Sequence, residues 1–138
     1  MKLPTGFVTG LLALLLFTAG SCKKDNPVQP VSYDRYNLIS VDGGSLPAEV
    51  DSGSDWIEEV TTGRVDLFAD GRFTTSFTWR RTSQSTGVTT ESETESGTYQ
   101  ISGTTLSATY DTGSSISGTI SGNDITVTED GHTLVFRK

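Results

Sequence analysis

The stretch VDLFADGRFTTSFTW, residues 65–79, decides the fold class of this chain. Apolar side chains alternate with polar ones on both sides of Asp70-Gly71: first Val65 and Leu67, then Phe73, Phe77 and Trp79. A period of two places alternate side chains on one face of a β-strand. An Asp-Gly pair supplies the positive φ that a tight hairpin turn needs. The stretch therefore predicts two antiparallel strands that share one apolar face.

The same alternation continues to the end of the chain. Its apolar positions are Leu106, Ala108 and Tyr110, then Ile116, Gly118 and Ile120, then Ile125 and Val127, then Leu134 and Phe136. Turn signals separate these runs: Ser83 to Gly87, Ser102-Gly103, Thr112-Gly113, Gly122-Asn123 and Asp130-Gly131. No segment after residue 21 has ten residues of helical periodicity with caps, so the sequence predicts an all-β domain.

Short turns make strands that follow each other in the chain neighbours in the sheet. The expected topology is therefore an antiparallel up-and-down meander of about eight strands over residues 35–138. Such a sheet has one apolar face to cover and two edges to protect, and closure into a small barrel does both.

Three segments of this region resemble the lipocalin-like domains of small bacterial lipoproteins. They are Tyr36-Asn37-Leu38 with Leu46-Pro47, Leu67 to Phe73, and Gly97-Thr98-Tyr99. The resemblance implies a small up-and-down barrel over about residues 33–138. The Gly-x-Trp signature of true lipocalins is missing near the first strand, so transport of a lipophilic ligand is not implied.

The N-terminal segment has the features of a secretory signal. Lys2 precedes an apolar run over residues 6–19, and the small residues Ala19-Gly20-Ser21 precede Cys22, the only cysteine. The run is shorter than the ~20 residues of a membrane span. The segment resembles the bacterial lipobox, which implies removal of residues 1–21 and attachment of lipid to the sulfur and the new amino group of Cys22. The alternative is a soluble secreted protein with one free thiol.

Residues 22–34 are interpreted as a tether, because they are polar and contain Pro27 and Pro30. Lys23 stands where some bacteria place an inner-membrane retention aspartate. By that resemblance, the expected location is the outer membrane of the cell envelope, with the membrane itself as a partner through the lipid.

Charge and composition exclude some classes of partner. The chain has 10 Lys and Arg against 17 Asp and Glu, and loss of Lys2 with the signal leaves a net charge of −8. Nucleic acid and anionic headgroups both require a basic face, so neither is an expected partner. No cofactor is expected, and a lone histidine with a single lipidated cysteine leaves no metal site to predict.

Five aromatic side chains are expected to point into the barrel: Phe73, Phe77, Trp79, Tyr99 and Tyr110. They are large enough to line a pocket for a small apolar ligand. An eight-stranded barrel is only just wide enough for its own side chains, however, so a packed core is the favoured alternative.

Glu91, Glu93 and Glu95 share the parity of Tyr99, so an unbroken strand would point three carboxylates inward. A bulge near Ser96-Gly97 would turn them to solvent, where Arg80 could pair with them, and we favour this arrangement. In the alternative, the strand projects past the core and Arg81, Glu91 and Glu93 form a polar rim around an open mouth.

Catalytic chemistry is not expected. His132 follows the Asp130-Gly131 turn, where we expect it to be solvated, and no nucleophile is paired with it. Asp51, Asp55, Glu58 and Glu59 surround an expected passage from loop to strand, and a solvated surface is favoured there over a calcium site.

Three function classes then compete. The leading hypothesis is a membrane-anchored binding or accessory module, for a small apolar ligand or an envelope protein. The alternative is a structural or protein-interaction lipoprotein with no small ligand. An enzyme is the least favoured, because no base stands beside a nucleophile.

Overall fold

The computed structural model describes residues 31–138, and all regular secondary structure in them is β-strand. This range contains no helix of the length and apolarity that a bilayer crossing requires. Cys22, the segment 1–21 and most of the segment 22–34 lie outside the described residues, so the signal, the lipid and the tether stay predictions.

Ten strands follow one another along the described part of the chain. They are β1 (Tyr33–Val41), β2 (Gly44–Ser45), β3 (Ala48–Ser52), β4 (Trp56–Phe68), β5 (Arg72–Ser83), β6 (Gly87–Ser102), β7 (Thr105–Tyr110), β8 (Ser115–Ser121), β9 (Asp124–Glu129) and β10 (His132–Arg137). The predicted turns are confirmed, since each contains a glycine with positive φ: Gly71, Gly87, Gly103, Gly113, Gly122 and Gly131.

Eight of these strands, β1 and β4 to β10, form a closed antiparallel barrel. Each of the strands β4 to β9 pairs with the strand that follows it, and β1 closes the barrel by pairing with both β10 and β4. The predicted all-β meander and its closure are confirmed. The short strands β2 and β3 pair with β1 and β4, respectively, and the alternation pattern did not predict them.

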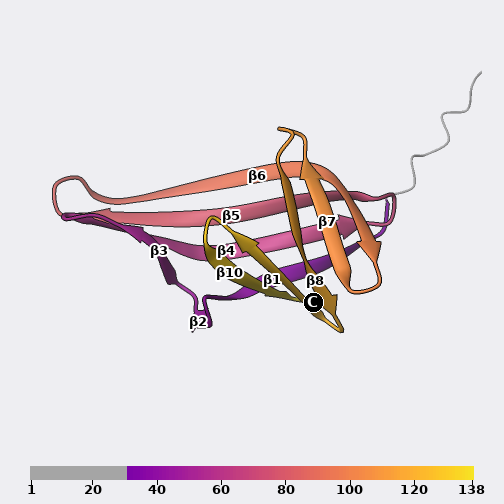
Figure 1. The fold of residues 1–138 in the computed structure, drawn as a ribbon. Helices are drawn as coiled ribbons and strands as arrows, with labels where there is room; N and C mark the ends of the chain where they lie inside the picture. Colours follow the sequence, from indigo (N-terminus) through magenta and orange to yellow (C-terminus); the bar gives the residue numbers. More distant parts are fainter. Residues whose placement is uncertain (1–30) are drawn as a thin grey trace, which may run out of the picture.

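The strands of the barrel are unequal in length. β4, β5 and β6 contain 13, 12 and 16 residues, whereas β7 to β10 contain six or seven each. Strand β7 pairs only with Gly97–Ser102 of β6, so residues 87–96 pair with β5 alone. Figure 1 shows the three long strands running far past the shorter ones to the β5–β6 hairpin. One end of the barrel therefore continues into a projecting sheet.

The core fills the part of the barrel where all eight strands are present. Phe136, Ile125 and Val60 are its largest fully buried side chains. The Phe73 ring packs edge-on against Tyr110 with centroids 5.2 Å apart.

A bulge in β4 decides which of its side chains face inward. The register with β5 shifts between Val60 and Thr62, and the Thr61 hydroxyl donates a hydrogen bond to the Thr78 carbonyl oxygen over 3.0 Å. The extra residue inverts the alternation, so Glu58 and Val60 face the same side as Val65. The expected passage from loop to strand is present, because residues 53–55 separate β3 from β4, which begins at Trp56. Asp51 lies in β3, and Glu58 and Glu59 lie in β4.

Candidate functional site

A cavity of about 500 Å³ lies where the long strands leave the barrel, and we call it the cleft. Strands β3 to β6 and the β9–β10 hairpin line it. Its lining comprises Val50, Asp51, Glu58, Val60, Thr75, Phe77, Trp79, Glu93, Glu95, Glu129, Asp130, His132 and Leu134. Small-molecule sites in proteins typically measure about 300 to 1,000 Å³, so the cleft has the size of a ligand site.

Phe77 and Trp79 form the aromatic part of the cleft lining. Their rings are stacked with centroids 5.5 Å apart, and Phe77 also contacts the buried Phe136 edge-on at 6.1 Å. Both side chains are only partly buried, because the β7 to β10 side of the barrel does not reach them fully.

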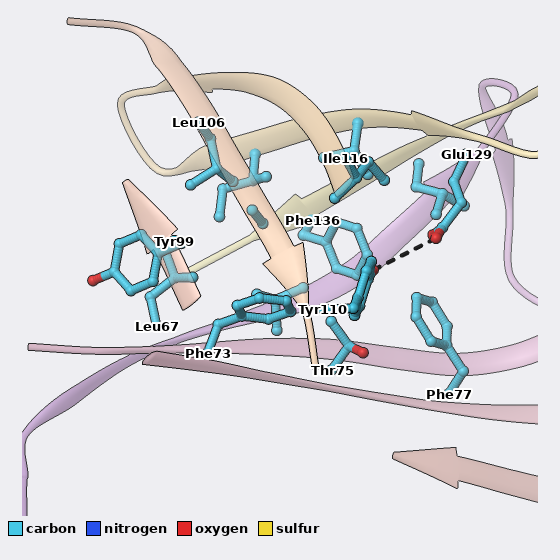
Figure 2. A pocket seen from close by; sticks show the side chains of 15 residues that line it. Leu67, Phe73, Thr75, Phe77, Tyr99, Leu106, Tyr110, Ile116, Glu129 and Phe136 are labelled. Atoms are coloured by element: carbon cyan, nitrogen blue, oxygen red, sulfur yellow. Dashed lines mark hydrogen bonds between the residues drawn. The ribbon is translucent and has the colours of Figure 1, made fainter. Parts of the chain in front are cut away.

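The other three predicted aromatics belong to the packed interior. Phe73, Tyr99 and Tyr110 surround a void of only about 30 Å³, which Figure 2 shows from close by. The Tyr99 hydroxyl donates to the Phe68 carbonyl oxygen over 2.8 Å. The five aromatics are therefore divided between a filled core and an open cleft. Whether any of them binds a ligand stays a prediction.

The bulge predicted near Ser96-Gly97 was wrong. The pairing of β5 with β6 is continuous from Arg72–Thr98 to Ser83–Gly87. Glu95, Glu93 and Glu91 stand opposite Thr75, Phe77 and Trp79, respectively. Cross-strand partners point to the same face of a sheet, so the three carboxylates lie on the inner side, and Glu93 and Glu95 line the cleft. The three carboxylates are not buried in the core, because this half of β6 projects beyond it.

Arg80 and Arg81, near the end of β5, occupy opposite faces of the strand. Arg80 points outward and donates two hydrogen bonds to Glu59, at 3.0 and 2.7 Å, so it does not pair with the glutamates of β6. Arg81 lies over the Trp56 ring and 3.8 Å from Glu58. With Glu91 and Trp79 it lines a second hollow of about 70 Å³. The predicted rim residues Arg81 and Glu91 therefore lie together, and their role stays a prediction.

Six carboxylates line the cleft: Asp51, Glu58, Glu93, Glu95, Glu129 and Asp130. His132 is the only basic residue that lines it in the described part of the chain. Within residues 31–138, only Glu58 among these six forms an ion pair. Glu129 is half-buried and accepts a long hydrogen bond of 3.5 Å from the Tyr110 hydroxyl, drawn as a dashed line in Figure 2. Burial raises the pKa of Glu129, and the neighbouring charges of Asp130 and Glu95 raise it further.

Thr75 is a buried polar side chain at the inner end of the cleft that lacks a partner. It is 5% exposed, and its hydroxyl oxygen has no hydrogen bond within the described part of the chain. The side chain lines both the cleft and the interior void. Figure 2 shows it between Tyr110 and Phe77. The sequence offered no signal for Thr75, because threonine is an ordinary strand residue.

Two contacts hold His132, and its side chain remains 30% exposed. Its Nδ1 lies 2.7 Å from a carboxylate oxygen of Asp42, and its Nε2 lies 2.9 Å from the Val50 carbonyl oxygen. Both contacts are satisfied when both ring nitrogens carry protons. The hydrogen bond to Asp42 raises the pKa of His132, and the backbone N–H of Thr133 holds the pKa of Asp42 below its usual range.

We expect this contact to make stability depend on pH. The folded pKa of His132 lies above its ordinary value of 6.5, so the stabilisation is complete below that value and is lost as pH rises through the folded pKa. Chemical denaturation of the wild type and His132→Gln should differ more at about pH 5.5 than at about pH 9. This dependence of the difference on pH should shrink when Asp42→Asn is the background. An equal difference at both pH values would contradict the assignment.

Between residues 31 and 138, no three His, Cys, Asp or Glu side chains are arranged so that they could hold a metal ion. Comparisons of the chain with known protein families, with curated proteins and with solved structures find no match. The shape and chemistry of the cleft are therefore the basis for assigning a function.

Proposed function

We propose that this chain is a binding protein of the cell envelope, anchored through lipid on Cys22, whose cleft holds a small ligand with an apolar part. The cleft carries this proposal, because it combines a volume of about 500 Å³ with the partly exposed rings of Phe77 and Trp79. The void of about 30 Å³ in the barrel interior offers no comparable space.

The direction of the chain supports display of the cleft away from a membrane. Strand β1 begins at Tyr33 opposite Phe68, beside the β4–β5 turn, whereas the cleft lies toward the β5–β6 turn. Figure 1 shows these two turns at opposite ends of the long strands. A tether over residues 22–34 would then join the barrel at the end remote from the cleft. We propose the outer membrane as its location, on the resemblance at Cys22 and Lys23.

Binding is favoured over catalysis by the geometry of His132. Both of its ring nitrogens already contact protein atoms, so neither is free to accept a proton from a nucleophile. The carboxylates of the cleft also repel polyanions, which agrees with the absence of nucleic acid among the expected partners.

The alternative is an interaction protein with no small ligand, and the projecting half of β6 favours it. Residues 87–96 have a strand neighbour on one side only, and Val88 is exposed there. Such an edge can accept a strand from another chain. The charges on Glu91, Glu93 and Glu95 oppose this, because inward-pointing charged residues are a common protection of edge strands.

Native mass spectrometry of the full chain, extracted gently from the envelope, tests the proposal. We expect the wild type to retain a small molecule and Trp79→Ala to lose it, with Ile101→Ala, on an exposed residue of β6, as the control. The Cys22→Ser chain should move to the soluble fraction. A chain that retains no small molecule, but crosslinks to one recurrent protein, would establish the alternative instead.

A further inference from the structure

The cleft presents an unusual combination of an aromatic surface with clustered negative charge. Phe77 and Trp79 lie on β5, directly opposite Glu93 and Glu91 on β6. Carboxylates next to the faces of aromatic rings attract cations, because the rings add a favourable quadrupole to the charge. An anionic or purely apolar ligand would instead leave the carboxylates of the cleft unpaired.

The inner end of the cleft supplies a second and independent observation. Thr75 is 5% exposed and its hydroxyl has no partner within residues 31–138, which is costly for a buried polar group. A valine would fill the same space without that cost. The side chain lines the inner end of the cleft, and Figure 2 shows its oxygen on the side of Phe77. A bound molecule that reaches this end and donates a hydrogen bond would satisfy the hydroxyl.

Two carboxylates line the cleft near Thr75. Glu95 is the cross-strand partner of Thr75, and the half-buried Glu129 lines the same inner end from β9. Glu95, Glu129 and Asp130 repel one another, and a positive charge bound between them would relieve that repulsion. A cationic donor would also form charge-assisted hydrogen bonds with the carboxylates, which are about twice as strong as neutral ones.

We propose that the cleft binds an organic primary ammonium ion with an apolar body. The ammonium group lies between Glu95 and Glu129 and donates a hydrogen bond to the Thr75 hydroxyl, and the apolar body lies against Phe77 and Trp79. This inference rests on the proposed function and names the class of ligand.

Three probes with the same six-carbon body test the inference by calorimetric titration of the full chain in a non-ionic detergent. Hexylammonium should bind at least about tenfold more tightly than hexanol, which lacks the charge. Hexyltrimethylammonium keeps the charge but has no N–H to donate, so we expect it to bind more weakly than hexylammonium.

Three substitutions assign the contacts. Glu95→Gln and Glu129→Gln should each weaken hexylammonium about tenfold, whereas Glu49→Gln, an exposed residue of β3 outside the cleft, should leave its affinity unchanged. Thr75→Val should weaken hexylammonium about tenfold and leave hexyltrimethylammonium unchanged. The Thr75→Val variant should resist urea as well as the wild type or better. This result would show that a contact with the ligand was lost and that the fold was not damaged.

The outcomes distinguish this inference from the proposed function. Equal binding of hexanol and hexylammonium, or no effect of Glu95→Gln and Glu129→Gln beyond faster aggregation, would overturn the ammonium site while leaving a binding cleft in place. In the latter case the glutamates only protect the edge of β6. Failure of all three probes, together with no molecule retained from the envelope, would overturn both.

Discussion

Phe136→Ala is expected to lower the free energy of unfolding by about 3 to 5 kcal/mol. The side chain is 1% exposed and stands on β10 opposite Leu38, at the seam where the barrel closes. Its ring meets Phe77 edge-on, so it also supports the aromatic lining of the cleft. Truncation would enlarge the small void beside it, and a cavity that cannot collapse adds to the lost burial.

Urea denaturation followed by far-ultraviolet circular dichroism measures this effect. Ile101→Ala is the control, because that side chain is 46% exposed and its truncation should cost no more than about 0.5 kcal/mol. We also expect Phe136→Ala to weaken binding in the cleft, since Phe77 loses its support. A loss below about 1 kcal/mol would mean that neighbouring side chains repack into the space.

Gly97→Ala is expected to cost about 3 kcal/mol or more, for a reason that involves the course of β6. A Cβ at this position would overlap the Thr109 carbonyl oxygen of β7 and lie 2.7 Å from a ring carbon of Phe73. The pairing of β6 with β7 begins at Gly97, directly after the projecting residues 87–96. The missing side chain therefore allows β7 and Phe73 to approach at the point where the barrel ends.

The control for this substitution is Gly103→Ala. Gly103 has φ +62, and no atom lies within 4 Å of the position that an alanine Cβ would take, so only backbone strain of about 1 to 2 kcal/mol is expected. The two variants compared by thermal and urea denaturation separate steric overlap from backbone strain. A cost at Gly97 no greater than that at Gly103 would show that β6 and β7 can move apart easily.

Much of the fold follows from local signals. The alternation around Asp70-Gly71 and the glycine turns predict the strands and their order, because each signal acts within a few residues. The predicted lipidation of Cys22 rests on its sequence context alone. The inward direction of Phe73, Tyr99 and Tyr110 also follows from parity, since their strands have no register shift there.

The candidate site was less predictable because it depends on neighbouring strands. The inward position of Glu58 depends on the bulge at Thr61, which no residue type announces. Glu129 and Glu95 come together because β9 and the projecting β6 border one cleft. Gly97 suggested a bulge, yet its small size allows the backbone of Thr109 in β7 to approach closely. The two explanations can be told apart only when the position of β7 is known.

The sequence by itself determined that this chain is an all-β meander, because period and turn conformation are properties of short segments. Only the tertiary structure decided that the barrel has a filled interior and an open acidic cleft. That difference arises from unequal strand lengths and from contacts between distant residues, such as His132 with Asp42, 90 positions apart. Such contacts depend on which strands become neighbours, and alternation along one strand carries no information about the residues beside the next.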